Sequence, residues 1–335
     1  MTKDKTDSGG HAMSDAYAIQ ITETGGAEVL KKVAIQARQP GPGEALVRQT
    51  AVGLNFIDTY HRSGLYPVKL PFVPGTEGAG IVEAIGEGVD TINVGDRVAY
   101  LGVGTYASHY TGAASSMVKL PDGLNEETAA SVMLKGLTAW MLLFEVRRAM
   151  PGDTALVWAP VGGVGSLLTP WATAMGVRVI GVTSTADKAE NALKLGATDV
   201  VFSTDDVAEK VRGLTDGRGV DVSFDSVGRS SAQASLDSLR PRGWWISFGN
   251  ASGAADPIAP GVLGQKGSLV LTRPSLFAFV NTPDGLRRGT AALFGALKTG
   301  TIEAQIGQRF DLSDIGEAHA KLESGQTVGA TVLRP

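Results

Sequence analysis

The first third of the chain has a distinctive pattern of hydrophobic and polar positions. Short apolar segments within 17–55, 78–89 and 95–102 alternate with turns rich in glycine and proline. Short strands separated by such turns are typical of antiparallel sheets and small barrels. The sequence therefore predicts a β-rich, partly barrel-like unit in this region.

The pattern changes after Glu126. Segment 127–146 has helical periodicity, and after Gly152 apolar runs of strand length alternate with amphipathic segments. The predicted strands are 155–158, 178–185, 197–203, 219–228, 244–250 and 268–276, and the helices between them include 186–196, 205–217 and 231–243. This alternation predicts a doubly wound parallel sheet. From about Asp284 we expect two helices and a closing strand at 329–335, which return to the first unit.

A glycine-rich turn follows the first predicted parallel strand. The apolar run Ala155–Trp158 precedes Gly162, Gly163 and Gly165, and an apolar segment of helical length follows them. A strand, a glycine turn and a helix in this order form a dinucleotide-binding unit, because glycines let the backbone approach a pyrophosphate at the helix N-terminus. The pattern is A-x-x-G-x-x-G rather than the strict G-x-G-x-x-G, so alone it could be an ordinary turn.

The same segment has a second interpretation. Residues 154–177 carry no charge and are long enough to span a bilayer. Pro160, Pro170 and the glycines make a single spanning helix a poor fit, so we expect a buried core instead.

Composition and charge narrow the function classes. The 335 residues are 43% hydrophobic and 19% charged, with a formal net charge of −4 and no basic run. This balance is typical of a globular enzyme and gives no electrostatic support for binding nucleic acid or an acidic membrane surface. We therefore expect neither a nucleic-acid partner nor a membrane partner.

The chain contains no cysteine. Disulfides, thiolate catalysis and sulfur-ligated zinc are therefore excluded, and a reducing cytoplasm is a compatible location. Residues 1–15 are polar and lack the apolar core of a signal peptide, so we expect a disordered leader there.

The end of the second parallel strand bears on the choice of nucleotide. NAD enzymes usually place an acid there to bind the ribose 2′-hydroxyl, but 182–185 contains none, and the first acid is Asp187. Ser184 and Lys188 could instead accept a 2′-phosphate, so the sequence favours NADP. The alternative is that Lys188 is an ordinary exposed lysine of the next helix.

Segment 55–67, NFIDTYHRSGLYP, is specific enough to indicate a family. From about Ala18 to its end, the chain resembles the zinc-independent quinone oxidoreductases of the medium-chain dehydrogenase/reductase superfamily, the group that includes zeta-crystallin. Further segments that fit in order are LKGLTAW (134–140), VGGVG (161–165), DSVGR (225–229), SFGNASG (247–253) and TRPSL (272–276).

The resemblance implies a fold and an assembly. It implies a GroES-like catalytic domain over 16–135 and 280–335, and a Rossmann domain over 136–279. It further implies a cleft between them that holds NADPH, a homodimer through the strand near 269–272, and a cytoplasmic enzyme.

The resemblance also carries an expected chemistry. The zinc branch of the superfamily has a cysteine near Gly53–Asn55 and a histidine where this chain has Thr76, so we expect no catalytic metal. A quinone can accept a hydride from NADPH without a Lewis acid, because the added charge spreads over the ring. The alternatives are an NADPH-dependent reductase of enone or alkenal double bonds, and a nucleotide-binding protein with little turnover.

The family pattern assigns the site residues. Asn55, Tyr60 and Tyr66 lie beside the nicotinamide and the acceptor, and either tyrosine could donate a proton or only line the pocket. The cofactor-binding residues implied are Lys135, Thr138, Gly162, Gly163, Val164, Ser184, Lys188, Phe248, Gly249 and Asn250. Ser203 stands where bacterial relatives have a tyrosine on the adenine side, and Arg273 is expected at the interface or the cleft floor.

Overall fold

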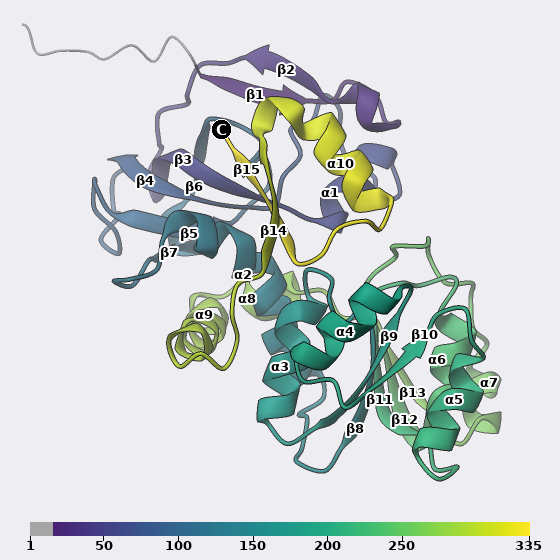
Figure 1. The fold of residues 1–335 in the computed structure, drawn as a ribbon. Helices are drawn as coiled ribbons and strands as arrows, with labels where there is room; N and C mark the ends of the chain where they lie inside the picture. Colours follow the sequence, from purple (N-terminus) through teal and green to yellow (C-terminus); the bar gives the residue numbers. More distant parts are fainter. Residues whose placement is uncertain (1–15) are drawn as a thin grey trace, which may run out of the picture.

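The computed structural model describes residues 16–335, and the predicted leader at 1–15 lies outside the described residues. Two large sheets lie in two parts of the molecule (Figure 1). A small antiparallel pair, β1 (Tyr17–Gln20) and β2 (Lys31–Ala34), lies at the outer side of the β-rich part. The two predicted units, one β-rich and one with a parallel sheet, are confirmed.

The β-rich part contains a seven-stranded sheet in the order β14-β15-β3-β4-β5-β7, with β6 paired to β3. The strands are β3 (Glu44–Leu54), β4 (Glu77–Ile85), β5 (Arg97–Leu101), β6 (His109–Ala113), β7 (Met117–Lys119), β14 (Ile306–Asp311) and β15 (Ala330–Arg334). β15 pairs antiparallel with β3, so the end of the chain joins the sheet that its beginning forms. Most of β3 is buried, and its two exposed residues, Arg48 and Thr50, lie on the same face of the strand.

The other sheet has six strands in the order β10-β9-β8-β11-β12-β13, all paired in parallel. They are β8 (Thr154–Trp158), β9 (Arg178–Thr183), β10 (Asp199–Phe202), β11 (Val220–Asp225), β12 (Leu239–Ser247) and β13 (Val270–Thr272). The order reverses between β8 and β11. In open α/β sheets, ligands bind at the carboxyl ends of the strands beside such a switch point.

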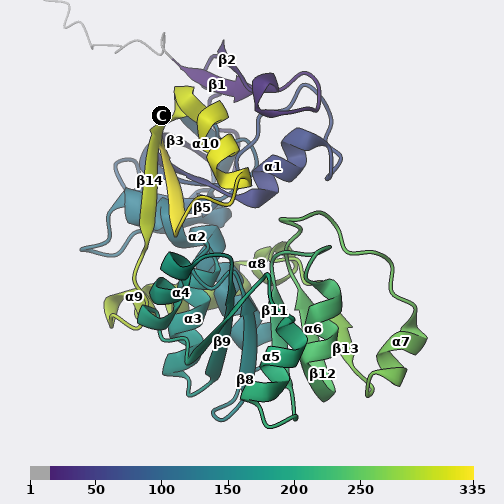
Figure 2. The same cartoon turned by 45° about the vertical axis from the view of Figure 1, so that its right-hand side comes forward.

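Helices cover both faces of the parallel sheet. α3 (Gly165–Ala174) and α4 (Ala186–Lys194) lie to one side of the strands, and α5 (Val207–Leu214) and α6 (Ala232–Ser238) to the other (Figures 1 and 2). α7 (Pro260–Gln265) lies near β13, outside this layer (Figure 2).

The largest hydrophobic core joins the two parts of the molecule. At its centre is α2 (Glu126–Trp140), which continues into η4 (Met141–Val146) and packs against β3, α3 and α9. α8 (Phe277–Val280) and α9 (Pro283–Lys298) follow the parallel sheet, and α10 (Ile315–Glu323) lies beside α1 (Phe56–Ser63) in the β-rich part. The predicted domain limits at 135/136 and 279/280 stay predictions; the first lies inside α2.

One helical stretch in the described residues, Glu126–Val146, is long and apolar enough to cross a membrane by length and composition. In the fold, 78% of its most apolar window is buried inside the protein. The core position of α2 and η4 accounts for this apolarity.

Several predicted elements were wrong or missing. The predicted helix at 231–243 ends at Ser238, and β12 begins at Leu239, because a proline at 241 disfavours helical geometry in the preceding residue. α1 was not predicted, nor was β14 in the tail, where alternate residues are half-buried. Both gain their stability from packing against distant segments, which local periodicity does not report.

Candidate active site

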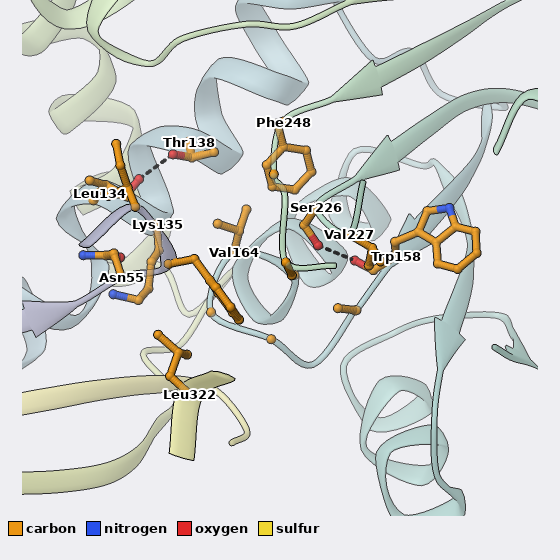
Figure 3. Close-up of a pocket in the computed structure, with 18 of the residues that line it drawn as sticks. Asn55, Leu134, Lys135, Thr138, Trp158, Val164, Ser226, Val227, Phe248 and Leu322 are labelled. Carbon is orange, nitrogen blue, oxygen red and sulfur yellow. Dashed lines mark hydrogen bonds between the residues drawn. The ribbon is translucent and has the colours of Figure 1, made fainter. Parts of the chain in front are cut away.

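A cavity of about 810 Å³ lies between the β-rich part and the carboxyl ends of β8, β9, β11 and β12. Residues from both parts line it (Figure 3). The predicted site residues that line it are Asn55, Tyr60, Tyr66, Lys135, Thr138, Gly162, Gly163, Val164, Ser184, Lys188, Phe248 and Gly249. Asn250 is not part of the lining, but its backbone contacts Tyr60. The fold thus brings the predicted residues together, while their individual roles stay predictions.

The glycine turn shapes the centre of the cavity. A side chain at Gly165 would clash with the backbone oxygen of Ala159, which shows how closely helix α3 approaches the end of β8. A Cβ at Gly163 would lie 3.1 Å from the Lys135 side chain, so glycine keeps this side of the cavity open. The N-terminus of α3, where the Ser166 N–H donates to Gly162 O and the Leu168 N–H to Val164 O, carries the positive end of the helix dipole. This turn can therefore hold a phosphate.

A buried charge cluster fixes one wall. The Glu77 side chain is fully buried, and its Oε1 accepts hydrogen bonds from Lys135 Nζ at 2.7 Å and Asn55 Nδ2 at 2.8 Å. Its Oε2 accepts from the Leu134 backbone N–H at 2.6 Å. The ion pair compensates two charges that would be costly to bury alone. As a result, Asn55 and Lys135, which both line the cavity, are held in fixed orientations by their hydrogen bonds to Glu77 (Figure 3).

Helix α1 holds Asn55 from the other side. Asp58 accepts hydrogen bonds from the Asn55 backbone at 2.9 Å and from the Thr76 and Tyr106 hydroxyls at 3.0 Å. Burial raises the pKa of Asp58 to about 7, although these hydrogen bonds lower it. Asp58 lies outside the cavity lining, so its contacts support a structural role rather than that of a base.

The network continues to helix α10. The Tyr106 hydroxyl lies 3.0 Å from His319 Nε2, and Arg62 Nη1 lies 3.2 Å from His319 Nδ1. Arg62 also makes two hydrogen bonds to Glu323, at 2.7 and 2.9 Å. Burial and then the nearby Arg62 cation lower the pKa of His319 to about 3. The imidazole is therefore neutral and joins α1 to α10.

Two tyrosines of the β-rich part meet the end of β12 across the cavity. The Tyr60 hydroxyl accepts from the Asn250 backbone N–H at 2.9 Å, and the Tyr66 hydroxyl accepts from Arg273 Nη2 at 3.0 Å. Their rings pack edge to face with centroids 5.2 Å apart. Burial raises the pKa of Tyr60 to about 12. Arg273, which was expected at the interface or the cleft floor, lies in the cavity lining.

The opposite end of the cavity has fewer polar contacts. Ser184, Lys188 and Ser203 line it, and Lys188 Nζ donates to the backbone oxygen of Gly325 at 2.6 Å. The Thr183 hydroxyl is buried in the lining and has no hydrogen-bond partner among the described residues. Sequence reasoning missed Thr183, which its place at the end of β9 could have indicated, and Gly325, which no local signal marks.

Within residues 16–335, no group of three or more His, Asp or Glu side chains lies close enough to hold a metal. Thr76 stands at the position of the zinc-branch histidine, and its hydroxyl donates a hydrogen bond to Asp58. The neighbouring carboxylate, Glu77, is paired with Lys135. An ammonium therefore balances the carboxylate in this wall of the cavity.

Two family models match the chain. Residues 41–122 match an alcohol dehydrogenase GroES-like domain, and residues 163–278 match a zinc-binding dehydrogenase domain. Each match lies inside one of the two structural parts, so the predicted combination of a GroES-like and a Rossmann domain is confirmed.

Full-length relatives are also found. A Pseudomonas aeruginosa quinone oxidoreductase is 46% identical and covers 96% of this chain and all of its own. A 2-haloacrylate reductase from Burkholderia is 40% identical, over 95% of this chain and 98% of its own. The crystal structure of Escherichia coli quinone oxidoreductase complexed with NADPH matches with a TM-score of 0.93 and 42% identity, over 95% of this chain and all of that one.

Proposed function

The chain belongs to the quinone oxidoreductases of the medium-chain dehydrogenase/reductase superfamily, and from this premise we propose that it transfers a hydride from NADPH to a quinone. The observation that carries the proposal is the cavity, which joins the glycine turn to hydroxyl and amide groups from the β-rich part. The zinc-independent enzyme expected from the resemblance is thus the function that the site supports best.

The cavity fits NADPH. Its volume of about 810 Å³ is in the upper part of the usual range for ligand sites, roughly 300–1,000 Å³. The pyrophosphate would lie at the α3 N-terminus, over Gly162, Gly163 and Val164. Ser184, directly after β9, supplies a hydroxyl for the 2′-phosphate. Lys188 supplies a cation for the 2′-phosphate.

The nicotinamide end supplies alignment and hydrogen bonds. NADPH supplies the hydride when bound. We assign Phe248, Gly249 and Asn250 to the nicotinamide, and Lys135 and Thr138 to its carboxamide or to the pyrophosphate. Lys135 and Asn55 bring N–H donors held by buried Glu77, so little reorganisation is needed as charge develops on the acceptor.

The acceptor lies between the donors of the β-rich part. Tyr60 and Tyr66 both accept hydrogen bonds through their oxygens, which leaves their O–H groups to donate to the acceptor. A quinone needs only moderate polarisation, because its reduced ring delocalises the charge. The apolar side chains Leu134, Met141 and Phe248 in the lining exclude water from the reacting atoms.

One observation favours a second acceptor class. The Burkholderia relative named 2-haloacrylate reductase is 40% identical over nearly the whole chain, and its name indicates an activated alkene. Hydride addition to an enone or alkenal also places charge on an oxygen conjugated to the reacting carbon. The same donors therefore serve a double-bond reductase.

Assembly and location belong to the same proposal. β13 is the edge strand of the six-stranded sheet, and Leu271 on it is 36% exposed, so we propose a homodimer that pairs this edge with its copy. We propose a cytoplasmic location, where a soluble NADPH-dependent reductase meets its cofactor. We also propose that residues 16–135 and 280–335 form one domain and that residues 136–279 form the other.

Rapid mixing of the chelator-treated protein with NADPH or NADH, with 1,4-benzoquinone and an enone as parallel acceptors, tests the function. We expect fast NADPH oxidation with the quinone. Turnover with the enone alone would show that the enzyme reduces activated double bonds rather than quinones. NADPH binding, seen by fluorescence, without turnover of either acceptor would favour a nucleotide-binding protein.

A further inference from the structure

Arg273 connects the parallel sheet to the acceptor end of the cavity. It follows β13 directly, and its Nη1 donates to the backbone oxygens of Ser247 and Gly249, each at 2.9 Å. These carbonyls lie at the end of β12 and in the loop after it. The guanidinium is thus anchored to the strand end from which Phe248 and Gly249 line the cavity.

Tyr66 is held in place by the β-rich part. Gly64 ends α1 with φ of 83°, which turns the chain back toward the helix. The Tyr66 backbone N–H then donates to the backbone oxygen of Tyr60 at 3.0 Å. This turn brings the Tyr66 hydroxyl to 3.0 Å from Arg273 Nη2, although the two residues are 207 positions apart.

The direction of this hydrogen bond fixes the direction of the Tyr66 proton. A guanidinium has donors only, so the Tyr66 oxygen must be the acceptor. The Asn250 amide is satisfied when its nitrogen donates to Gly249 O at 2.8 Å and its oxygen accepts from Arg273 Nη2 at 3.2 Å. In that arrangement the Asn250 oxygen lies 3.4 Å from the Tyr66 hydroxyl, longer than an ordinary O–H···O hydrogen bond, and it already accepts from Arg273. The Tyr66 proton is therefore held only weakly within the protein and is available to donate into the cavity.

We propose that Arg273 is a positioning residue for acceptor reduction: it directs the Tyr66 hydroxyl proton to the acceptor oxygen and stabilises the charge left on Tyr66. The inference rests on the proposed hydride transfer and names the group that completes it. Its acceptors are conjugated carbonyl compounds, because their oxygen gains charge as the hydride arrives.

The step balances in atoms and charge. The hydride brings two electrons and one hydrogen to the quinone, which becomes a hydroquinone monoanion. The O–H bond of Tyr66 breaks as an O–H bond forms on the hydroquinone. The tyrosinate, paired with the Arg273 cation, then takes a proton from water. One NADPH and one solvent proton are consumed for each quinone reduced.

Tyr60 is less suited to giving up its proton. Its hydroxyl accepts from a neutral backbone N–H of Asn250 rather than from a cation, and burial raises its pKa to about 12. It therefore stays a hydrogen-bond donor to the same acceptor. The two tyrosines of the cavity thus divide orientation and proton transfer between them.

Four variants test the proposal: Arg273→Gln, Tyr66→Phe, the double variant, and Arg273→Lys. We expect each of the first two to lower kcat about 10- to 100-fold, in the range for loss of one transition-state donor or a catalytic proton donor. The double variant should be no slower than Tyr66→Phe, because both changes remove one function. Arg273→Lys should recover part of the rate, since an ammonium can still donate to Tyr66.

The readouts separate this role from a purely structural bridge. The dissociation constant of NADPH, measured by fluorescence, should stay within about twofold of wild type, as a binding equilibrium requires if the cofactor site is intact. The loss of rate should be largest for weakly oxidising methylated quinones and smallest for 1,4-benzoquinone. Arg229→Gln, an exposed arginine that donates to Ala254 O outside the cavity lining, is the matched control and should change neither value.

The results distinguish this inference from the function beneath it. If the wild type oxidises NADPH with quinones but the Arg273 and Tyr66 losses multiply in the double variant, the positioning role is wrong. It is also wrong if NADPH affinity falls by the same factor as the rate. A wild type without activity toward any quinone or enone would instead refute the proposed function.

Discussion

The two ends of the cavity differ in how far their polar groups are already paired within the protein. At the acceptor end, Asn55, Lys135 and Tyr60 each have hydrogen-bond partners at 2.9 Å or less. At the opposite end, which we assign to the adenosine, the Lys188 ammonium makes one hydrogen bond among the described residues, to the backbone oxygen of Gly325.

The difference reflects two tasks. Chemistry requires donors that are in place before the transition state, and a buried network holds them there without reorganisation. Nucleotide recognition can leave its polar groups unpaired, since the ligand itself satisfies them on binding. Substitutions at the acceptor end should therefore affect stability and rate, and substitutions at the adenosine end should affect only affinity.

Glu77→Gln should have the largest effect. It leaves the buried Lys135 ammonium without its counter-charge, which should lower the free energy of unfolding by about 3 kcal/mol in urea titrations. Glu83→Gln is the matched control: Glu83 pairs with Arg48 at the surface and is 38% exposed, so its loss should cost less than about 1 kcal/mol. Equal losses would show that the buried Glu77–Lys135 pair contributes no more to the free energy of unfolding than the surface pair does.

His319→Gln should change how stability depends on pH. The folded pKa of His319 is about 3 against 6.5 unfolded, so below pH 6.5 the unfolded chain takes up a proton that the folded protein does not. The wild type should therefore lose stability as the pH is lowered. Between pH 6.5 and pH 5, its free energy of unfolding should decrease by about 1.5 kcal/mol more than that of the variant.

Asp58 acts in the opposite direction. Its pKa is raised from 3.8 to about 7 in the folded protein, so it stabilises the fold as pH falls from 7 toward 4. Because Asp58 is present in both proteins, the difference between their urea curves isolates His319. Parallel curves for the two proteins would contradict a buried, neutral His319.

Tyr60→Phe should lower kcat by about tenfold, since one hydrogen-bond donor to the acceptor is lost while the ring and its packing remain. The unfolding midpoint should move little by comparison. Tyr110→Phe is the control, because Tyr110 stacks on Tyr100 and does not line the cavity. A raised KM with unchanged kcat would mean that Tyr60 only shapes the pocket.

Lys188→Ala should have the smallest effect. We expect the dissociation constant of NADPH to rise about fivefold, as for an exposed charge pair, while that of NADH and the unfolding midpoint stay unchanged. Lys194→Ala on the same helix removes an exposed lysine paired with Glu190 and serves as the control. Equal weakening of NADPH and NADH would show that Lys188 acts through Gly325 rather than on the 2′-phosphate.

Much of the fold could be predicted from the sequence because its signals are local. A buried strand such as Ala155–Trp158 is a short apolar run, and the glycine turn after it lies within a few residues, so neither depends on distant contacts. The motif at 55–67 indicated the family for the same reason. Of the residues assigned to the site, all but Asn250 line one cavity.

Contacts between segments that are distant in the chain could not be predicted from the sequence. α1 is held by Asn55 and Asp58 at its start, but its stability also depends on Arg62 reaching Glu323, 261 positions away. Strand β12 begins where it pairs with β11, not where the apolar run begins.

The chain by itself determined the glycine turn, the alternating strands and helices, and the lack of cysteine ligands, because each follows from residue types at short spacing. Only the tertiary structure decided that Lys135 would neutralise Glu77, that Gly325 would accept from Lys188, and that Arg273 would hold Tyr66. These contacts join residues that are 58, 137 and 207 positions apart in the chain. Their geometry exists only once both sheets are packed on α2.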